Sequence, residues 1–252
     1  MERGPVRILV IQHEDDAGPG LLGDRLRACG AAVTLAAPPG VVAGAAAIPA
    51  TPEGHDGVLV LGGSPGPTDD DRAPWLPRVR GLIAAALQSG TPLLGVCLGA
   101  QLLAYVAGGE VRPLDGGAEI GVHPLWPTEE AFSDPLLGGI DGQSQAVQWH
   151  ELEIAELPPG ARLLCRGERC PQQAFRIGRT AWGLQFHLEA DTGVVREWAR
   201  TGAADLDAAG IAAADLVADV QAAEPGLRAL WEPVADCWLG VCIDARDRHD
   251  SA

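Results

Sequence analysis

The chain has 252 residues, of which 47% are hydrophobic, and a formal net charge of −16. A chain of this length and composition can bury one sizeable core, and α/β folds of this size often form a single domain. Its 18 basic residues are all arginine, and so acidic a surface repels phosphate backbones and anionic lipids; we therefore expect neither nucleic acid nor a membrane as a partner. No apolar run reaches the roughly 20 residues of a membrane span. The six scattered cysteines indicate reduced thiols and a cytoplasmic location.

In the first part of the chain, apolar runs alternate with helical patterns, which is typical of a parallel sheet with crossover helices. The predicted strands are Val6–Ile11, Ala31–Ala36, Gly57–Leu61 and Pro92–Val96. The predicted helices are Leu21–Cys29, Pro74–Gln88 and Leu98–Val106.

The pattern then changes to short alternating strands, which predict a mixed or antiparallel extension of the sheet. These strands are Glu119–Trp126, Ala146–His150, Ala161–Arg166, Gln172–Ile177 and Ala181–Phe186. The longest irregular stretch, Pro127–Gln143, is a candidate lid or partner contact. From Asp191 to about Arg246 the sequence is rich in alanine and helical. We expect residues 1–200 to form one domain and residues 201–252 a helical extension packed on it.

A candidate nucleophile lies at the junction of a predicted strand and helix, in the sequence Gly95-Val96-Cys97-Leu98-Gly99. This spacing is typical of a nucleophile elbow, in which small residues leave room for a strained turn. The start of the following helix favours the reactive thiolate form of Cys97. The alternative is that Cys97 is a small buried apolar residue, as many free cysteines are.

A candidate base and its orienting acid follow a buried strand at Trp182–Phe186. His187 and Glu189 are two residues apart, so in an extended chain their side chains lie on the same face. A carboxylate there can hold one ring nitrogen while the other faces the cysteine. The order nucleophile, histidine, acid differs from that of the α/β-hydrolases. A histidine of purely structural role is the alternative.

Together, Gly95–Gln101 and Gln185–Glu189 resemble the class I glutamine amidotransferase family, most closely its stand-alone members similar to the glutaminase domain of GMP synthase. The resemblance extends from about Arg7 to Arg200. It implies that Cys97 attacks the γ-carboxamide of glutamine, that His187 acts first as base and then as acid, and that Glu189 orients His187.

The resemblance also implies an oxyanion hole formed by Gly62, Gly63 and the N–H of Leu98. This agrees with the physical expectation that a glycine turn at a strand's carboxyl end exposes amides toward a developing oxyanion. Many family members have proline where this chain has Ser64, and proline where it has Leu188. Neither departure removes a catalytic group, but both leave the exact substrate open.

Substrate contacts are implied at two further places. Gln101 matches the family position that touches the substrate glutamine. The stretch Gln148-Trp149-His150-Glu151 resembles the loop whose backbone receives the α-amino acid end of the substrate.

We expect no metal ion and no cofactor. His13–Asp16 is predicted to be a solvated loop that could also line the mouth of the site, and Asp69–Asp71 to be a charge cluster at a helix start. Gly62–Gly66 is not a phosphate-binding loop, because no Gly-Lys-Ser/Thr follows. Cys165 and Cys170 have no histidine near them in the sequence, which argues against zinc.

The expected fold is therefore a flavodoxin-like three-layer α/β sandwich with a mixed, mostly parallel central sheet and a helical C-terminal extension. Three functions remain open. The first is a glutaminase that passes ammonia to a synthase or other acceptor-enzyme subunit in another chain. The second is a γ-glutamyl peptidase or hydrolase that uses the same triad on a larger γ-glutamyl small molecule, and the third is a non-catalytic regulatory or binding protein.

Overall fold

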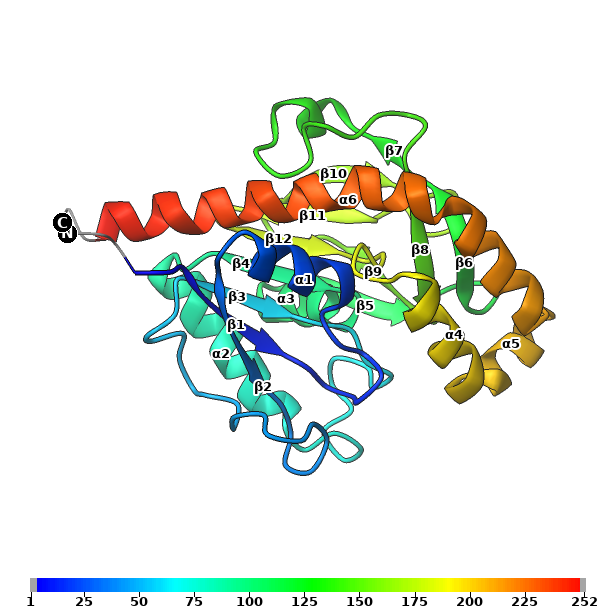
Figure 1. Cartoon of the computed structure of the whole chain (residues 1–252), viewed down its shortest axis with the longest axis horizontal. Coiled ribbons are helices and arrows are strands. Elements are labelled where there is room, and N and C mark those ends of the chain that lie inside the picture. Colours follow the sequence, from blue (N-terminus) through cyan, green and yellow to red (C-terminus); the bar gives the residue numbers. More distant parts are fainter. Residues whose placement is uncertain (1–3, 250–252) are drawn as a thin grey trace.

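The computed structural model describes residues 4–249 and is built around one eight-stranded sheet (Figure 1). In spatial order its strands are β2 (Ala32–Ala36), β1 (Arg7–Ile11), β3 (Gly57–Val60), β4 (Leu93–Val96), β12 (Ala181–Leu184), β11 (Ala174–Ile177), β10 (Arg162–Arg166) and β7 (Trp126–Pro127). The first five strands in this order are parallel, and the last three are antiparallel to their neighbours. The predicted mixed sheet is confirmed.

Helices cover both faces of the sheet and complete three layers (Figure 1). One face carries α1 (Gly20–Ala28) and α6 (Ala213–His249), and the other carries α2 (Leu76–Ser89) and α3 (Leu98–Val106). The strands β1, β3 and β4 are apolar almost throughout because both of their faces are buried under helices. The flavodoxin-like sandwich is therefore confirmed.

Two small antiparallel sheets stand beside the main one. The first pairs β6 (Glu119–Pro124) with β8 (Gln145–His150), and the second pairs β5 (Glu110–Pro113) with β9 (Leu152–Glu156). Neither β5 nor β9 was predicted. Strand β5 is mostly exposed and ends in proline, so its sequence carries no clear alternation of apolar and polar residues.

The irregular stretch Pro127–Gln143 contains one short helix, η1 (Glu129–Ser133). Its anchor is the buried carboxylate of Asp134, which accepts hydrogen bonds from the N–H of Leu136 and from the indole of Trp182. None of its residues lines the cavity of about 600 Å³ beside Cys97, so this stretch is not a lid over that cavity.

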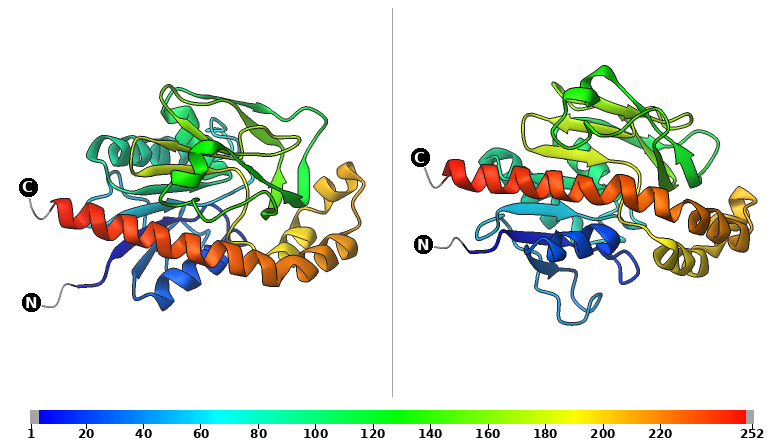
Figure 2. Two further views of the ribbon diagram at one scale, coloured as in Figure 1. Left: turned by 90° about the horizontal axis from the view of Figure 1, so that it is seen from above. Right: turned by 45° about the horizontal axis from the view of Figure 1, so that its top comes forward.

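The C-terminal region contains α4 (Thr192–Thr201), α5 (Ala203–Ala209) and the 37-residue helix α6, which runs along the whole molecule (Figure 2). The side chain of Trp238, on α6, is fully buried, and the ring of Trp231, on the same helix, packs 4.9 Å from that of Phe186. Both indoles therefore anchor the helix on the body of the protein. The boundary near residue 200 stays a prediction. Within residues 4–249 no helix is both long and apolar enough to cross a bilayer.

Candidate active site

Cys97 lies between β4 and α3 with φ +49° and ψ −107°, and it is the only non-glycine residue with positive φ in the described part of the chain. Two glycines make this turn possible. A Cβ on Gly95 would lie 2.5 Å from the carbonyl oxygen of Gly99, and a Cβ on Gly99 would lie 2.0 Å from that of Val60. The backbone has the strained geometry expected of a nucleophile elbow.

His187 leaves the end of β12 and its backbone N–H donates to the carbonyl of Val147, 2.8 Å away. Its Nδ1 lies 2.8 Å from Oε1 of Glu189, and both side chains are buried. Burial lowers the pKa of His187, but the Glu189 carboxylate and the hydrogen-bonded sulfur of Cys97 outweigh it and hold that pKa well above its usual value. The three groups proposed from the sequence are thus brought together, with the imidazole between acid and thiol.

Glu189 is fixed by its backbone as well as by His187. Its carbonyl accepts from the N–H of Leu21 at 2.9 Å, and a Cβ on Gly20 would lie only 2.2 Å from that same oxygen. Gly20 has φ +42°, so the start of α1 is shaped to approach the acid closely. The second carboxylate oxygen, Oε2, is buried and has no hydrogen-bond partner among the described residues.

Gly62 and Gly63 follow β3, and Gly62 lies against the imidazole of His187 and the Cβ of Cys97. A Cβ on Gly63 would lie 3.3 Å from Cδ2 of Leu98, so the glycine loop touches the first turn of α3. The N–H of Leu98 has no partner within its helix, because the first N–H groups of a helix have no preceding carbonyl. Gly62 thus lies next to Cys97 and Gly63 next to Leu98, and the role of these residues as an oxyanion hole stays a prediction.

Ser64, which stands in place of a proline, is part of a polar network at the rim. Its N–H donates to the carboxylate of Glu14, and its hydroxyl accepts from Nη2 of Arg72 at 2.7 Å. This network fixes the outer end of the glycine loop.

The residues expected to bind substrate separate into two groups. Gln101, Trp149 and His150 line the cavity, and the Gln101 amide donates to the carbonyl of Leu152. Gln148 is not among the residues that line it: its side chain is fully buried and donates to the side-chain oxygen of Gln173.

A cavity of about 600 Å³ opens above Cys97 and His187. Its acidic lining side chains are Glu14, Asp16, Asp69, Glu151 and Asp205. Among the described residues, Arg72 is the one positively charged residue, histidine apart, that lines the cavity. Glu14 and Asp16, which the sequence favoured as a solvated loop, thus belong to the mouth of the site.

Comparison with known proteins agrees with this geometry. The family model described as "Glutamine amidotransferase class-I" matches residues 22–198. The chain belongs to the class I glutamine amidotransferase family. A GMP synthase [glutamine-hydrolyzing] of Porphyromonas gingivalis is 37% identical over 141 residues, which are 55% of this chain and 26% of that protein. A protein of Thermococcus kodakarensis that is named as one subunit of such a GMP synthase is 36% identical over 39% of this chain and 50% of its own length.

The amidotransferase chain therefore matches about a quarter of the length of the GMP synthases and half of the separate subunit. Among solved structures, a glutamine amidotransferase from Thermotoga maritima superposes with a TM-score of 0.82 at 26% identity, covering 94% of this chain and 99% of that one. One from Methylobacillus flagellatus has a TM-score of 0.79 at 28% identity, covering 95% of each chain.

Two residues of the amidotransferase site were not singled out from the sequence. The amide of Gln185 lies 3.7 Å from the sulfur of Cys97 and also accepts from Gln101. The indole of Trp198 packs edge-on against the His187 ring, with 4.6 Å between centroids, and donates to the carbonyl of Asp16. Gln185 belongs to the motif Gln185–Glu189 but was not assigned a role of its own. Trp198 lies on α4, and nothing in the sequence around it indicates a place in the site.

Proposed function

We propose that this chain hydrolyses the γ-amide of glutamine through a thioester on Cys97. The observation that carries the proposal is the buried imidazole of His187, held by Glu189 and hydrogen-bonded to the sulfur of an elbow cysteine. An arrangement of nucleophile, base and orienting acid is the general basis of covalent acyl transfer.

In the first half-reaction, His187 takes the thiol proton of Cys97, the sulfur bonds to the γ-carboxamide carbon, and the carbonyl electrons move to oxygen. The N–H groups of Gly62, Gly63 and Leu98 stabilise that oxyanion. Protonated His187 then gives its proton to the amide nitrogen, the C–N bond breaks, and ammonia leaves.

In the second half-reaction, His187 takes a proton from water as the water oxygen bonds to the thioester carbon. The C–S bond breaks, glutamate leaves, and the thiolate of Cys97 and protonated His187 are restored. Glu189 stabilises the imidazolium in both half-reactions.

We further propose that the ammonia passes to an acceptor enzyme in another polypeptide, in the cytoplasm. In support, the similar protein of Thermococcus kodakarensis is named as one subunit of a GMP synthase. All six cysteines of the chain are free, as expected of a reducing compartment.

A second candidate is hydrolysis of larger γ-glutamyl compounds by the same three residues. The observation that favours it is the cavity of about 600 Å³, a volume within the range that accommodates drug-sized ligands and more than glutamine alone needs.

One assay separates these candidates. The purified chain is given glutamine, γ-glutamyl dipeptides and γ-glutamyl amines, and ammonia, free amine and glutamate are measured, with Cys97→Ala as the blank. Ammonia from glutamine, stimulated by an acceptor enzyme, supports the amidotransferase function. Rapid cleavage of γ-glutamyl dipeptides with no ammonia from glutamine supports the second candidate, and no Cys97-dependent product from any substrate contradicts both.

A further inference from the structure

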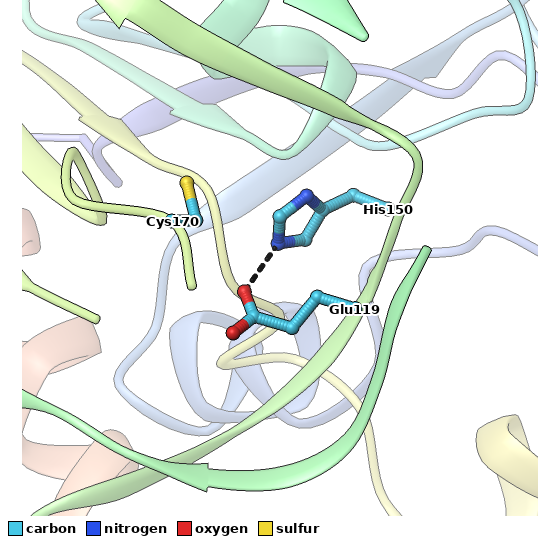
Figure 3. A group of neighbouring side chains, drawn as sticks. All are labelled: Glu119, His150 and Cys170. Carbon is cyan, nitrogen blue, oxygen red and sulfur yellow. Dashed lines mark hydrogen bonds and ion pairs between the residues drawn. The ribbon is translucent and has the colours of Figure 1, made fainter. Parts of the chain in front are cut away.

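The structure contains a buried group of three potential metal ligands (Figure 3). One of them, His150, also lines the catalytic cavity. Glu119 extends from β6, His150 from β8, and Cys170 from the turn between β10 and β11. One ligand atom of each lies within 4.8 Å of the other two. None of the three takes part in the proposed acyl transfer.

The imidazole of His150 is oriented as a metal ligand. Its Nδ1 lies 2.9 Å from the carbonyl of Leu152, which can only accept, so Nδ1 carries a hydrogen. Its Nε2 lies 3.0 Å from Oε2 of Glu119, so one proton is held between these two atoms. Metal-binding histidines commonly donate their other N–H to a carbonyl in this way.

The sulfur of Cys170 completes the group by its position. It lies within 4.8 Å of the ligand atoms of Glu119 and His150, and the residue is fully buried. A divalent ion bound there would hold this sulfur as the thiolate, because a coordinated thiol loses its proton.

A fourth donor is within reach. The amide nitrogen of Gln173 lies 3.0 Å from Oε2 of Glu119, and its oxygen accepts from the amide of Gln148. The amide oxygen of Gln148 is buried and unpaired among the described residues. A 180° rotation of both side-chain amides exchanges the nitrogen and oxygen of each. The hydrogen bond between Gln148 and Gln173 is then preserved in the reverse direction, and the oxygen of Gln173 points toward the cluster.

We propose that Glu119, His150 and Cys170 form a binding site for a thiophilic divalent cation, with Zn²⁺ the best match. One carboxylate, one imidazole and one thiolate form a donor set that zinc uses and that Mg²⁺ or Ca²⁺ does not. Zn–N and Zn–O bonds of about 2.0–2.1 Å and a Zn–S bond of about 2.3 Å place tetrahedral ligand atoms roughly 3.3–3.6 Å apart. The pair Nε2 of His150 and Oε2 of Glu119, at 3.0 Å, therefore needs to open slightly, and the sulfur of Cys170 needs to approach them by no more than about 1.5 Å.

The charges and protons of the binding step balance. Zn²⁺ replaces the proton held between His150 and Glu119 and the thiol proton of Cys170, and two protons are released. The resulting group of Zn²⁺, one carboxylate and one thiolate is neutral, which suits its burial.

The site could not be found from the sequence. Cys170 has no histidine near it along the chain, but antiparallel pairing of β6 with β8 places Glu119 opposite His150, and the turn after β10 brings Cys170 to both. The ion would tie these segments together. The carbonyl of Trp149, next to His150, lies 3.8 Å from the sulfur of Cys97, so occupation of the site would restrain the wall of the catalytic cavity.

The test is cobalt titration of the metal-free full chain in a Cys97→Ala background, so that the candidate nucleophile cannot hold the ion. We expect one Co²⁺ per chain, with a thiolate-to-cobalt charge-transfer band that Zn²⁺ displaces. Cys165→Ser, which removes another fully buried cysteine, should keep the band, and Cys170→Ser should abolish it.

Glu119→Gln, which preserves the size of the side chain, should weaken Co²⁺ binding at least tenfold. If Cys170→Ser does not fold, this variant alone tests the proposal. Absence of a one-to-one complex in the Cys97→Ala parent overturns the proposal. So does a band that persists in Cys170→Ser, or unchanged affinity in Glu119→Gln. Because the titration measures no turnover, its outcome is independent of the proposed glutaminase activity.

Discussion

Gly62 lies directly against the imidazole of His187: a Cβ on Gly62 would stand 3.0 Å from Cε1 of His187 and 3.5 Å from the Cβ of Cys97. Contacts near 3.0 Å are too short for two carbon atoms without movement, and no flexible side-chain end is there to yield. An added methyl group would therefore have to displace the imidazole by a few tenths of an ångström, so packing favours glycine here beyond any role of its N–H in holding an oxyanion.

The first prediction is that Gly62→Ala lowers kcat by about 10²-fold, because even a 1 Å displacement of a catalytic group has effects of that size. Circular dichroism should show an unchanged fold. The control is Gly81→Ala in α2, where an added Cβ meets nothing within 4 Å, and turnover should stay normal. Full activity in Gly62→Ala would show that the imidazole tolerates displacement and would contradict the proposed geometry.

The second prediction concerns Glu189→Gln. The amide keeps the shape of the side chain but removes the anion that raises the pKa of His187, so kcat should fall by about 10³-fold or more. The alkaline limb of the pH–rate profile should move to lower pH, because the pKa of the imidazolium is then lower. The matched control is Glu153→Gln, another buried carboxylate, which pairs with Arg112 outside the cavity and should keep the wild-type profile. Near-normal turnover in Glu189→Gln would place the orienting group elsewhere.

Much of this site was predictable because its parts are local in sequence. The elbow needs only a strand, a helix and two small residues around Cys97, and the histidine–acid pair needs only the two-residue period of an extended chain. Both patterns are visible without knowledge of the fold.

Other parts depend on contacts between distant segments and have no local pattern. The side chain of Gln148 is held out of the cavity by a buried hydrogen bond to Gln173, a residue on a distant segment of the chain. Trp198 reaches His187 only because the fold brings α4 beside the segment that follows β12. The strands β5 and β9 were missed because each is short and stabilised by the other rather than by its own alternation.

The third prediction is that a diazo-ketone analogue of glutamine labels Cys97 before the other five cysteines at neutral pH. The enclosed Cys165 and Cys170 lack access, and burial raises the pKa of each thiol to about 12. Mass spectrometry of the partly labelled protein identifies the site. His187→Ala should slow labelling strongly, since the imidazolium that stabilises the thiolate is lost. Labelling first at the exposed Cys29 or Cys237, with activity retained, would contradict the assignment.

The last prediction concerns stability and His13, which lies behind the glycine loop with no exposed surface. The indole N–H of Trp75 donates to its Nδ1 at 3.1 Å, so the proton of the neutral ring is on Nε2, which is buried and unpaired in the described structure. Burial lowers the pKa of His13 from 6.5 to about 4. Between these two pH values the unfolded chain binds a proton that the folded chain does not bind. The free energy of unfolding should therefore rise with pH over this interval. The contribution is fully present above pH 6.5 and is lost as the pH falls toward about 4, with a total of roughly 3 kcal/mol.

Urea unfolding at several pH values, compared between wild type and His13→Gln, separates the contribution of His13 from that of the carboxylates, which titrate in both proteins. The variant should show the shallower dependence, by up to one proton, and an identical dependence in the two proteins would mean that His13 is protonated in the folded state.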